Sequence, residues 1–312
     1  MQNKFQKFVS VIFIVLGFGL LIFSFYQKPI SIFQKLEEFA MLEMAAVPIR
    51  NSESEINNQE FLVSITAEAV YVMDNPSAST LLAKNEDERL FPASTVKMMT
   101  ALTALKLYGD EDKFIVEHGD FEHGNKNNLV VGEELTRNDL LKLLLITSDN
   151  DAALLLAQHH DEGYMGFVRE MNILAQELSL GATFFKNPIG FDDYEQLVSA
   201  RDLAILAYEL MQNEFLHNIV GIKETVVTDT SGKNRHNLYT TNEFLAEEFG
   251  IMGVKTGTTD LAGQVLVTQV EKGGKSILIV VMKSQDRFAD TKKIIDFCFE
   301  NYTWVNYQEL ID

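Results

Sequence analysis

Cysteine is almost absent from this sequence, and Cys298 is the only one among 312 residues. A single cysteine excludes an intramolecular disulfide and a metal site built from several thiolates. The six histidines include no His-x-x-x-His pair, the spacing that places two metal ligands on one face of a helix. We therefore expect neither a bound metal nor another cofactor.

Basic side chains are also in the minority. The chain has 26 Lys and Arg residues against 45 Asp and Glu residues, which gives a formal net charge of −19. Proteins that bind nucleic acid need clustered Lys and Arg to contact phosphates, so this balance argues against such a partner. It indicates instead a well-solvated surface. The 46% hydrophobic content is enough for the core of one large domain or two modest ones.

Charge is missing altogether from Phe8–Tyr26, a run that follows Lys4 and Lys7. As a helix it would be about 28 Å long, close to the hydrocarbon thickness of a bilayer. Because no small-x-small cleavage site follows closely, we interpret residues 8–26 as an uncleaved transmembrane signal anchor and residues 1–7 as a cytoplasmic N-terminus. A cleaved signal peptide is the alternative. Both interpretations place the rest of the chain outside the cytoplasm, and the first makes it a single-pass protein of the cell membrane.

A stalk or linker is expected over residues 27–60. Apolar residues repeat at helical spacing in residues 30–44, whereas residues 51–60 are polar and lack such a pattern. We expect the folded domain to cover residues 61–305 and a short tail to cover residues 306–312.

Strand patterns lie at both ends of this domain, and helix patterns lie between them. The expected strands are Ala67–Met73, Thr80–Ala83, Ala262–Glu271 and Lys275–Met282, the last two joined as a hairpin at Lys272-Gly273-Gly274. The expected helices are one capped by Thr136 and Asp139, Asn150–His160, Tyr164–Leu178 with Gly181 as its stop, and a closing helix Asp290–Asn301. This order predicts an α+β domain whose sheet is assembled from distant parts of the chain.

Ser94 and Lys97 offer a nucleophile with its own base. They are three residues apart, so in a helix the hydroxyl and the amine share a face. A desolvated lysine can take the proton of a serine and make that serine a nucleophile. The pair alone predicts little, because Ser-x-x-Lys also arises by chance in an ordinary helix turn.

Two further motifs strengthen the case for chemistry. Ser148-Asp149-Asn150 interrupts two expected helices, which would suit either a helix cap or side chains that point into a cleft. Lys255-Thr256-Gly257 precedes the final hairpin. It is either an ordinary strand end or a place where a lysine, a hydroxyl and a glycine admit a carboxylated peptide.

In this order the three motifs form the set found in serine β-lactamases and penicillin-binding proteins. From about Phe61 to Trp304 the chain resembles the low-molecular-weight D-alanyl-D-alanine carboxypeptidases. The segments that carry the resemblance are Pro92–Thr100, Ser148–Ala153, Thr183–Gly190, Ser199–Leu203 and Gly253–Gly257. The resemblance implies a β-lactamase/transpeptidase-like fold, with an antiparallel sheet flanked by helices and an inserted all-helical subdomain. Such carboxypeptidases commonly add a C-terminal β-rich domain, which we expect this chain to lack.

The resemblance implies catalytic roles for four motif residues. Ser94 would attack the carbonyl of the D-Ala-D-Ala bond in a peptidoglycan stem peptide, with Lys97 as proton acceptor. Ser148 would relay the proton to the leaving nitrogen, and Asn150 would hold the substrate amide. The backbone N–H groups of Ser94 and Thr258 would form the oxyanion hole. β-Lactam antibiotics would be covalent inhibitors that acylate the same serine.

The resemblance also implies a site for the substrate's terminal carboxylate. Lys255, Thr256 and Arg287 would bind it, and the strand continues through Gly257 and Thr258. For Arg287 the alternative is a surface arginine at a strand end.

Two other functions remain open. A class A β-lactamase would share the motifs but uses a glutamate on a loop after the second motif to activate water. Residues 182–190 contain no glutamate, and Glu195 comes later, which favours the peptidase. The other alternative is a catalytically silent, membrane-tethered protein that only binds peptidoglycan or penicillin, although the chain has every catalytic residue expected from the resemblance.

Overall fold

The computed structural model describes residues 46–51, 57–117, 127, 129–246 and 250–305. The expected anchor at residues 8–26 and the helical pattern at residues 30–44 lie outside these ranges. Within them, no helix has the length and apolar character needed to cross a membrane. One compact unit spans Val47–Trp304.

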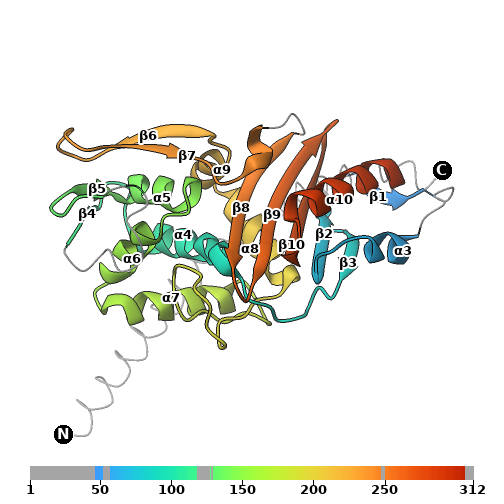
Figure 1. The fold of residues 1–312 in the computed structure, drawn as a ribbon, viewed down its shortest axis with the longest axis horizontal. Coiled ribbons are helices and arrows are strands. Elements are labelled where there is room, and N and C mark those ends of the chain that lie inside the picture. The colour runs from blue at the N-terminus through green and yellow to red at the C-terminus, as the bar shows by residue number, and fades with distance from the viewer. Residues whose placement is uncertain (1–45, 52–56, 118–126, 128, 247–249, 306–312) are drawn as a thin grey trace, which may run out of the picture. The chain divides into compact units, whose positions relative to one another are not determined.

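A five-stranded antiparallel sheet forms the centre of this unit (Figure 1). Its strand order is β3-β2-β10-β9-β8, with β2 at Ala69–Asp74, β3 at Thr80–Lys84, β8 at Ile251–Thr259, β9 at Gly263–Lys272 and β10 at Lys275–Ser284. The β9–β10 hairpin is confirmed, and both of its turn residues, Gly273 and Gly274, have positive φ as a tight hairpin requires. In the middle of the sheet Ile279 pairs with Val72, so the first strand joins the last hairpin.

Both faces of the sheet are covered, because β10 is apolar at successive positions. Ile277, Ile279 and Val281 belong to the core that includes Ile294 and Ile295 of α10 (Arg287–Asn301). The alternate residues Leu278, Val280 and Met282 belong to the core under α8 (Ala200–Gln212). Side chains alternate across a strand, so a continuous apolar run supplies two cores at once. Helices α8 and α10 thus lie on opposite faces of the sheet (Figure 1).

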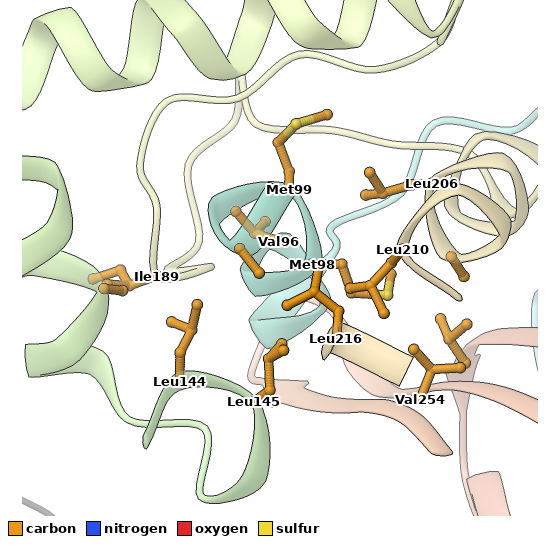
Figure 2. Packing of buried hydrophobic residues seen from close by; sticks show 14 of the residues in the cluster. Val96, Met98, Met99, Leu144, Leu145, Ile189, Leu206, Leu210, Leu216 and Val254 are labelled. Carbon is orange, nitrogen blue, oxygen red and sulfur yellow. The ribbon is translucent and has the colours of Figure 1, made fainter. Parts of the chain in front are cut away.

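A mainly helical region packs beside the sheet. It contains the turn η1 (Ala93–Thr95) and the helices α4 (Val96–Leu107), α5 (Arg137–Ile146), α6 (Asn150–Gln158), α7 (Gly163–Glu177) and α9 (Glu214–Val220). Two small hairpins, β4–β5 (Lys113–Ile115 with Glu134–Thr136) and β6–β7 (Glu224–Thr228 with Arg235–Tyr239), and the turn η2 (Glu243–Ala246) complete it. Figure 2 shows Val96 and Met98 of α4 packed between Leu144 and Leu145 of α5 and Leu210 of α8. The predicted α+β architecture is confirmed.

Three local expectations need correction. The folded unit begins before residue 61, because β1 (Val47–Arg50) pairs with β11 (Tyr302–Val305) and a capping box at Asn57 starts α3 (Asn58–Val63). Helix α10 begins at Arg287 rather than at Asp290, because the Asp286 side chain accepts a hydrogen bond from the Ala289 N–H.

The third correction concerns the end of α7, which we expected Gly181 to stop. The residue with left-handed backbone is Ser179, at φ +58°. The Leu180 N–H donates to the Ala175 carbonyl and the Ser179 N–H donates to the Gln176 carbonyl. These two bonds form a Schellman motif, which closes the helix two residues before the glycine.

Candidate active site

Ser94 lies half-buried in η1, where two glycines let other backbone segments approach it. A Cβ atom on Gly257 of β8 would lie 2.9 Å from the Ser94 nitrogen, and one on Gly190 would lie 2.0 Å from the Ala93 carbonyl oxygen. Gly190 also has φ +92°, which favours glycine. Strand β8 and the loop at residue 190 are therefore in direct backbone contact with the serine segment.

Lys97 is fully buried in the first turn of α4, and its amine lies close to oxygens from three segments of the chain. Its Nζ lies 3.2 Å from Ser94 Oγ, 2.7 Å from Asn150 Oδ1 and 2.6 Å from the Ile189 carbonyl oxygen. The amide and carbonyl oxygens can only accept hydrogen bonds, whereas the Ser94 hydroxyl can also donate. A neutral amine would donate hydrogen bonds to the Asn150 and Ile189 oxygens and present its lone pair to the Ser94 hydroxyl.

The loop that supplies the Ile189 carbonyl is organised by Asn187, a residue that was not among those expected to have a role. Asn187 Oδ1 accepts hydrogen bonds from the N–H groups of Ile189 (3.3 Å), Gly190 (2.7 Å) and Phe191 (3.1 Å). Thr100 Oγ1 on α4 donates to the Pro188 carbonyl at 2.7 Å. The sequence signal was the Asn-Pro-Ile-Gly turn chemistry of residues 187–190, which we noted only as part of the resemblance.

The Ser148-Asp149-Asn150 motif forms the junction between α5 and α6. Asp149 caps α6 by accepting a hydrogen bond from the Ala152 N–H at 2.8 Å, and Asn150 is the first helical residue. Ser148 has φ +58°, the left-handed region that serine rarely adopts. The motif is thus both a helix cap and a part of the site, because Asp149 caps α6 while Asn150 contacts Lys97.

On β8, successive residues of the third motif point to opposite faces of the strand. Gly257 faces the serine, so the buried Lys255, two positions earlier, lies on the same face. Lys255 Nζ donates to the Thr256 carbonyl at 2.9 Å, and Thr256 Oγ1 lies 2.8 Å from Thr241 Oγ1. Thr241 follows β7, so this contact ties β8 to the helical region.

Arg287, the first residue of α10, reaches across to β8. Its Nη1 donates to the Gly257 carbonyl (2.9 Å) and to Thr258 Oγ1 (2.7 Å). Burial lowers the pKa of this guanidinium, but an arginine stays protonated in proteins. Among the residues described here, its buried Nε has no hydrogen-bond partner. The chain thus holds a cation, with an unused donor, beside the strand that carries the third motif.

Asp290 fixes the start of α10 and with it the position of Arg287. Its carboxylate accepts hydrogen bonds from Thr66 Oγ1 (2.6 Å), Ser284 Oγ (2.7 Å) and the N–H groups of Thr66 (3.0 Å) and Ala67 (2.9 Å). Burial acts to raise the pKa of this carboxyl, but the hydrogen bonds together hold it below its usual value. The ionised form therefore stabilises the fold.

A sequence model of the D-alanyl-D-alanine carboxypeptidase family matches residues 53–286. The chain belongs to this family. Over 246 residues it is 33% identical to the D-alanyl-D-alanine carboxypeptidase DacF of Bacillus subtilis, a match that covers 76% of this chain and 63% of that protein. The chain therefore spans less than two thirds of the length of this relative.

Solved structures related to this carboxypeptidase family agree with the sequence comparison. The DD-transpeptidase of Streptomyces K15 superposes with a TM-score of 0.72 at 28% identity, over 76% of this chain and 98% of that one. Penicillin-binding protein D2 of Listeria monocytogenes, solved with ampicillin bound, gives a TM-score of 0.66 at 26% identity, over 75% and 98% of the two chains. The expected transpeptidase-like fold is confirmed. The comparisons favour the carboxypeptidase family over the class A β-lactamase that we kept as an alternative.

Proposed function

We propose that the chain is a serine D-Ala-D-Ala carboxypeptidase that removes the terminal D-alanine from peptidoglycan stem peptides. The observation that carries the proposal is the buried Lys97 amine between Ser94 Oγ, Asn150 Oδ1 and the Ile189 carbonyl. In its neutral form, this amine would donate hydrogen bonds to the Asn150 and Ile189 oxygens and present its lone pair to the Ser94 hydroxyl. The lone pair would then serve as the base that takes the serine proton.

In acylation, Ser94 Oγ attacks the carbonyl carbon of the D-Ala-D-Ala bond while its proton passes to Lys97 Nζ. The carbonyl oxygen becomes an oxyanion, and the N–H groups of Ser94 and Thr258 would stabilise it. Collapse of this intermediate breaks the C–N bond, and the proton passes from Lys97 through the Ser148 hydroxyl to the leaving nitrogen. The products are D-alanine and an ester on Ser94.

In deacylation, water attacks that ester and Lys97 accepts its proton. The second oxyanion forms in the same hole, and its collapse returns the proton to Ser94 Oγ and releases the shortened peptide. Residues 182–190 contain no glutamate that could activate water as in class A β-lactamases. A β-lactam would therefore acylate Ser94 and leave slowly, as an inhibitor rather than as a substrate.

Recognition of the substrate terminus would come from β8 and α10. Arg287 lies beside Gly257 and Thr258, and Lys255 and Thr256 precede them on the same strand. Two basic side chains and the hydroxyls of Thr256 and Thr258 suit a C-terminal carboxylate. Asn150 would hold the substrate amide with its Nδ2 group, since its Oδ1 contacts Lys97.

The compartment follows from the substrate. Peptidoglycan lies outside the cytoplasm, and this is where residues 47–304 would act. We propose that residues 8–26 tether the protein to the cell membrane as a single-pass anchor.

The test is a mass measurement on purified full-length chain. A pentapeptide ending in D-Ala-D-Ala should lose one alanine residue, and the Ser94→Ala variant should leave it intact. A chromogenic cephalosporin should be hydrolysed slowly at most. Rapid cephalosporin turnover would support the β-lactamase, and no reaction with either compound would support the silent binding protein.

A further inference from the structure

A buried histidine and glutamate lie beneath the β6–β7 hairpin, away from the motif residues. His236 of β7 is 5% exposed and Glu133 is 2% exposed. The imidazole Nε2 lies 2.5 Å from Glu133 Oε1, and Nδ1 lies 2.7 Å from the carbonyl oxygen of Asn127. Glu133 Oε2 accepts a hydrogen bond from the Val130 N–H at 2.9 Å. The pair thus contacts the backbone of the segment before β5 at Asn127 and at Val130.

The partners determine the protons on the imidazole. A carbonyl oxygen only accepts, so Nδ1 of His236 carries a hydrogen and donates it to Asn127. Nε2 lies against the Glu133 carboxylate, so each ring nitrogen has a hydrogen-bond partner, as a buried imidazole requires. Nδ1 donates to the Asn127 carbonyl whether or not Nε2 also carries a hydrogen.

The Asn127 side chain extends from this segment to the second motif. Its Nδ2 donates to Thr147 Oγ1 at 2.9 Å and to Asp149 Oδ2. These two acceptors flank Ser148 on either side. Through Asp149, the cap of α6, the same contact reaches Asn150 and its bond to Lys97.

Ser148 needs such support because of its backbone. A serine at φ +58° is in a sparsely populated conformation that persists only when its surroundings hold it. The Asn127 side chain bonds to Thr147 and Asp149, the residues before and after Ser148, and so opposes relaxation of the turn at Ser148. Because the chain is held on both sides of Ser148, the Ser148 hydroxyl stays in one place.

We propose that Asn127, held by the His236–Glu133 pair, is a positioning residue for Ser148 and Asn150. The inference rests on the proposed function, in which these two residues act on the substrate. It assigns to the β6–β7 hairpin the task of setting the geometry of the second motif, although no motif residue lies on that hairpin.

Two substitutions of His236 separate positioning from stability. Asparagine places its amide near the Nδ1 position, so His236→Asn keeps a donor for the Asn127 carbonyl and leaves Glu133 without its partner. Glutamine places its amide near the Nε2 position, so His236→Gln keeps the contact with Glu133 and loses Asn127. Because an unpaired buried carboxylate is costly, His236→Asn should be the less stable variant.

The assay is the second-order rate constant for acylation of Ser94 by a fluorescent penicillin, per folded molecule of full-length chain, with the melting temperature measured in parallel. We expect acylation to fall at least about tenfold in His236→Gln and in Asn127→Ala, and to stay within about threefold of wild type in His236→Asn. Activity and stability would then rank the two His236 variants in opposite orders. Lys233→Gln, an exposed change on the same hairpin, is the matched control and should alter neither.

Equal acylation rates in the two His236 variants, or a wild-type rate in Asn127→Ala, would overturn the inference. If His236→Asn does not fold, the double variant His236→Asn with Glu133→Gln removes the buried charge and replaces it in the comparison. Failure of the proposed function has a different signature. In that case the wild-type chain itself is not labelled, or it leaves the D-Ala-D-Ala peptide intact.

Discussion

Gly257→Ala tests whether backbone contact between β8 and the serine segment sets the rate. A methyl group here would lie 2.9 Å from the Ser94 nitrogen and 2.9 Å from Ala93 Cβ, and ordinary contact begins at 3.4 Å. The nitrogen belongs to the backbone and cannot rotate away, so β8 and η1 must separate by about 0.5 Å. Ser94 and Thr258, the residue after Gly257, supply the two proposed oxyanion donors. The separation therefore widens the oxyanion hole directly.

The expected cost falls on the chemistry more than on the fold. Overpacking of this kind destabilises by about 1–3 kcal/mol, which leaves the protein folded. Because hydrogen bonds to a developing oxyanion depend steeply on distance, we expect acylation by a fluorescent penicillin to slow by about 10- to 100-fold. Stopped-flow or gel-based labelling of the full-length chain measures this rate, and circular dichroism gives the folded fraction.

Gly181→Ala is the matched control, since a methyl group at Gly181 meets nothing within 4 Å. It should acylate at the wild-type rate. An acylation rate of folded Gly257→Ala within about twofold of wild type would contradict this prediction, because β8 would then tolerate the methyl group without moving the oxyanion donors.

Three further predictions address the parts around the serine. Arg287→Gln should raise KM about tenfold for a peptide with a C-terminal carboxylate and leave a peptide amide unaffected; equal effects on both would contradict carboxylate binding. Asn187→Ala should slow penicillin acylation about tenfold by releasing the loop that carries the Ile189 carbonyl, and an unchanged rate would refute that role. Asp290→Asn should unfold at lower temperature at pH 7. Because the pKa of Asp290 is lowered in the fold, its stabilisation is present above the unfolded value of about 4 and is lost as pH falls through the folded value. The difference in melting temperature between the wild type and Asp290→Asn should therefore narrow below about pH 4. A difference that stays constant with pH would contradict this.

Local signals predicted much of the fold. The glycine pair at residues 273–274 indicated the terminal hairpin, and Thr136 indicated the start of α5, where its Oγ1 accepts from the Asp139 N–H. The order of strands and helices indicated that the sheet joins distant parts of the chain, but it did not indicate which strands pair. The β1–β11 pairing joins the two ends of the folded unit, and because β1 was not expected, the N-terminal boundary was set too late. Sequence periodicity reports which face of a strand is buried, but it does not report the partner strand.

The candidate site also contains some parts that could be predicted from the sequence and others that could not. The three motifs could be recognised because together, in this order, they form a known set, although each one alone also fits an ordinary helix turn, helix cap or strand end. The Ile189 carbonyl could not, since every residue has a backbone carbonyl and only the folded loop brings this one to Lys97. Asn127 and His236 were missed for a related reason. A lone asparagine and a lone histidine have no pattern, and their link to Ser148 runs through contacts between residues 109 positions apart.

We expect Ser94 to be the nucleophile of an acyl-transfer reaction. Tandem mass spectrometry of the full-length chain, quenched during reaction with a penicillin and digested, tests it most directly. We expect one covalent adduct, on the peptide that contains Ser94, and no adduct in Ser94→Ala. An adduct on another residue, or an unmodified Ser94 in the folded wild-type chain, would contradict it.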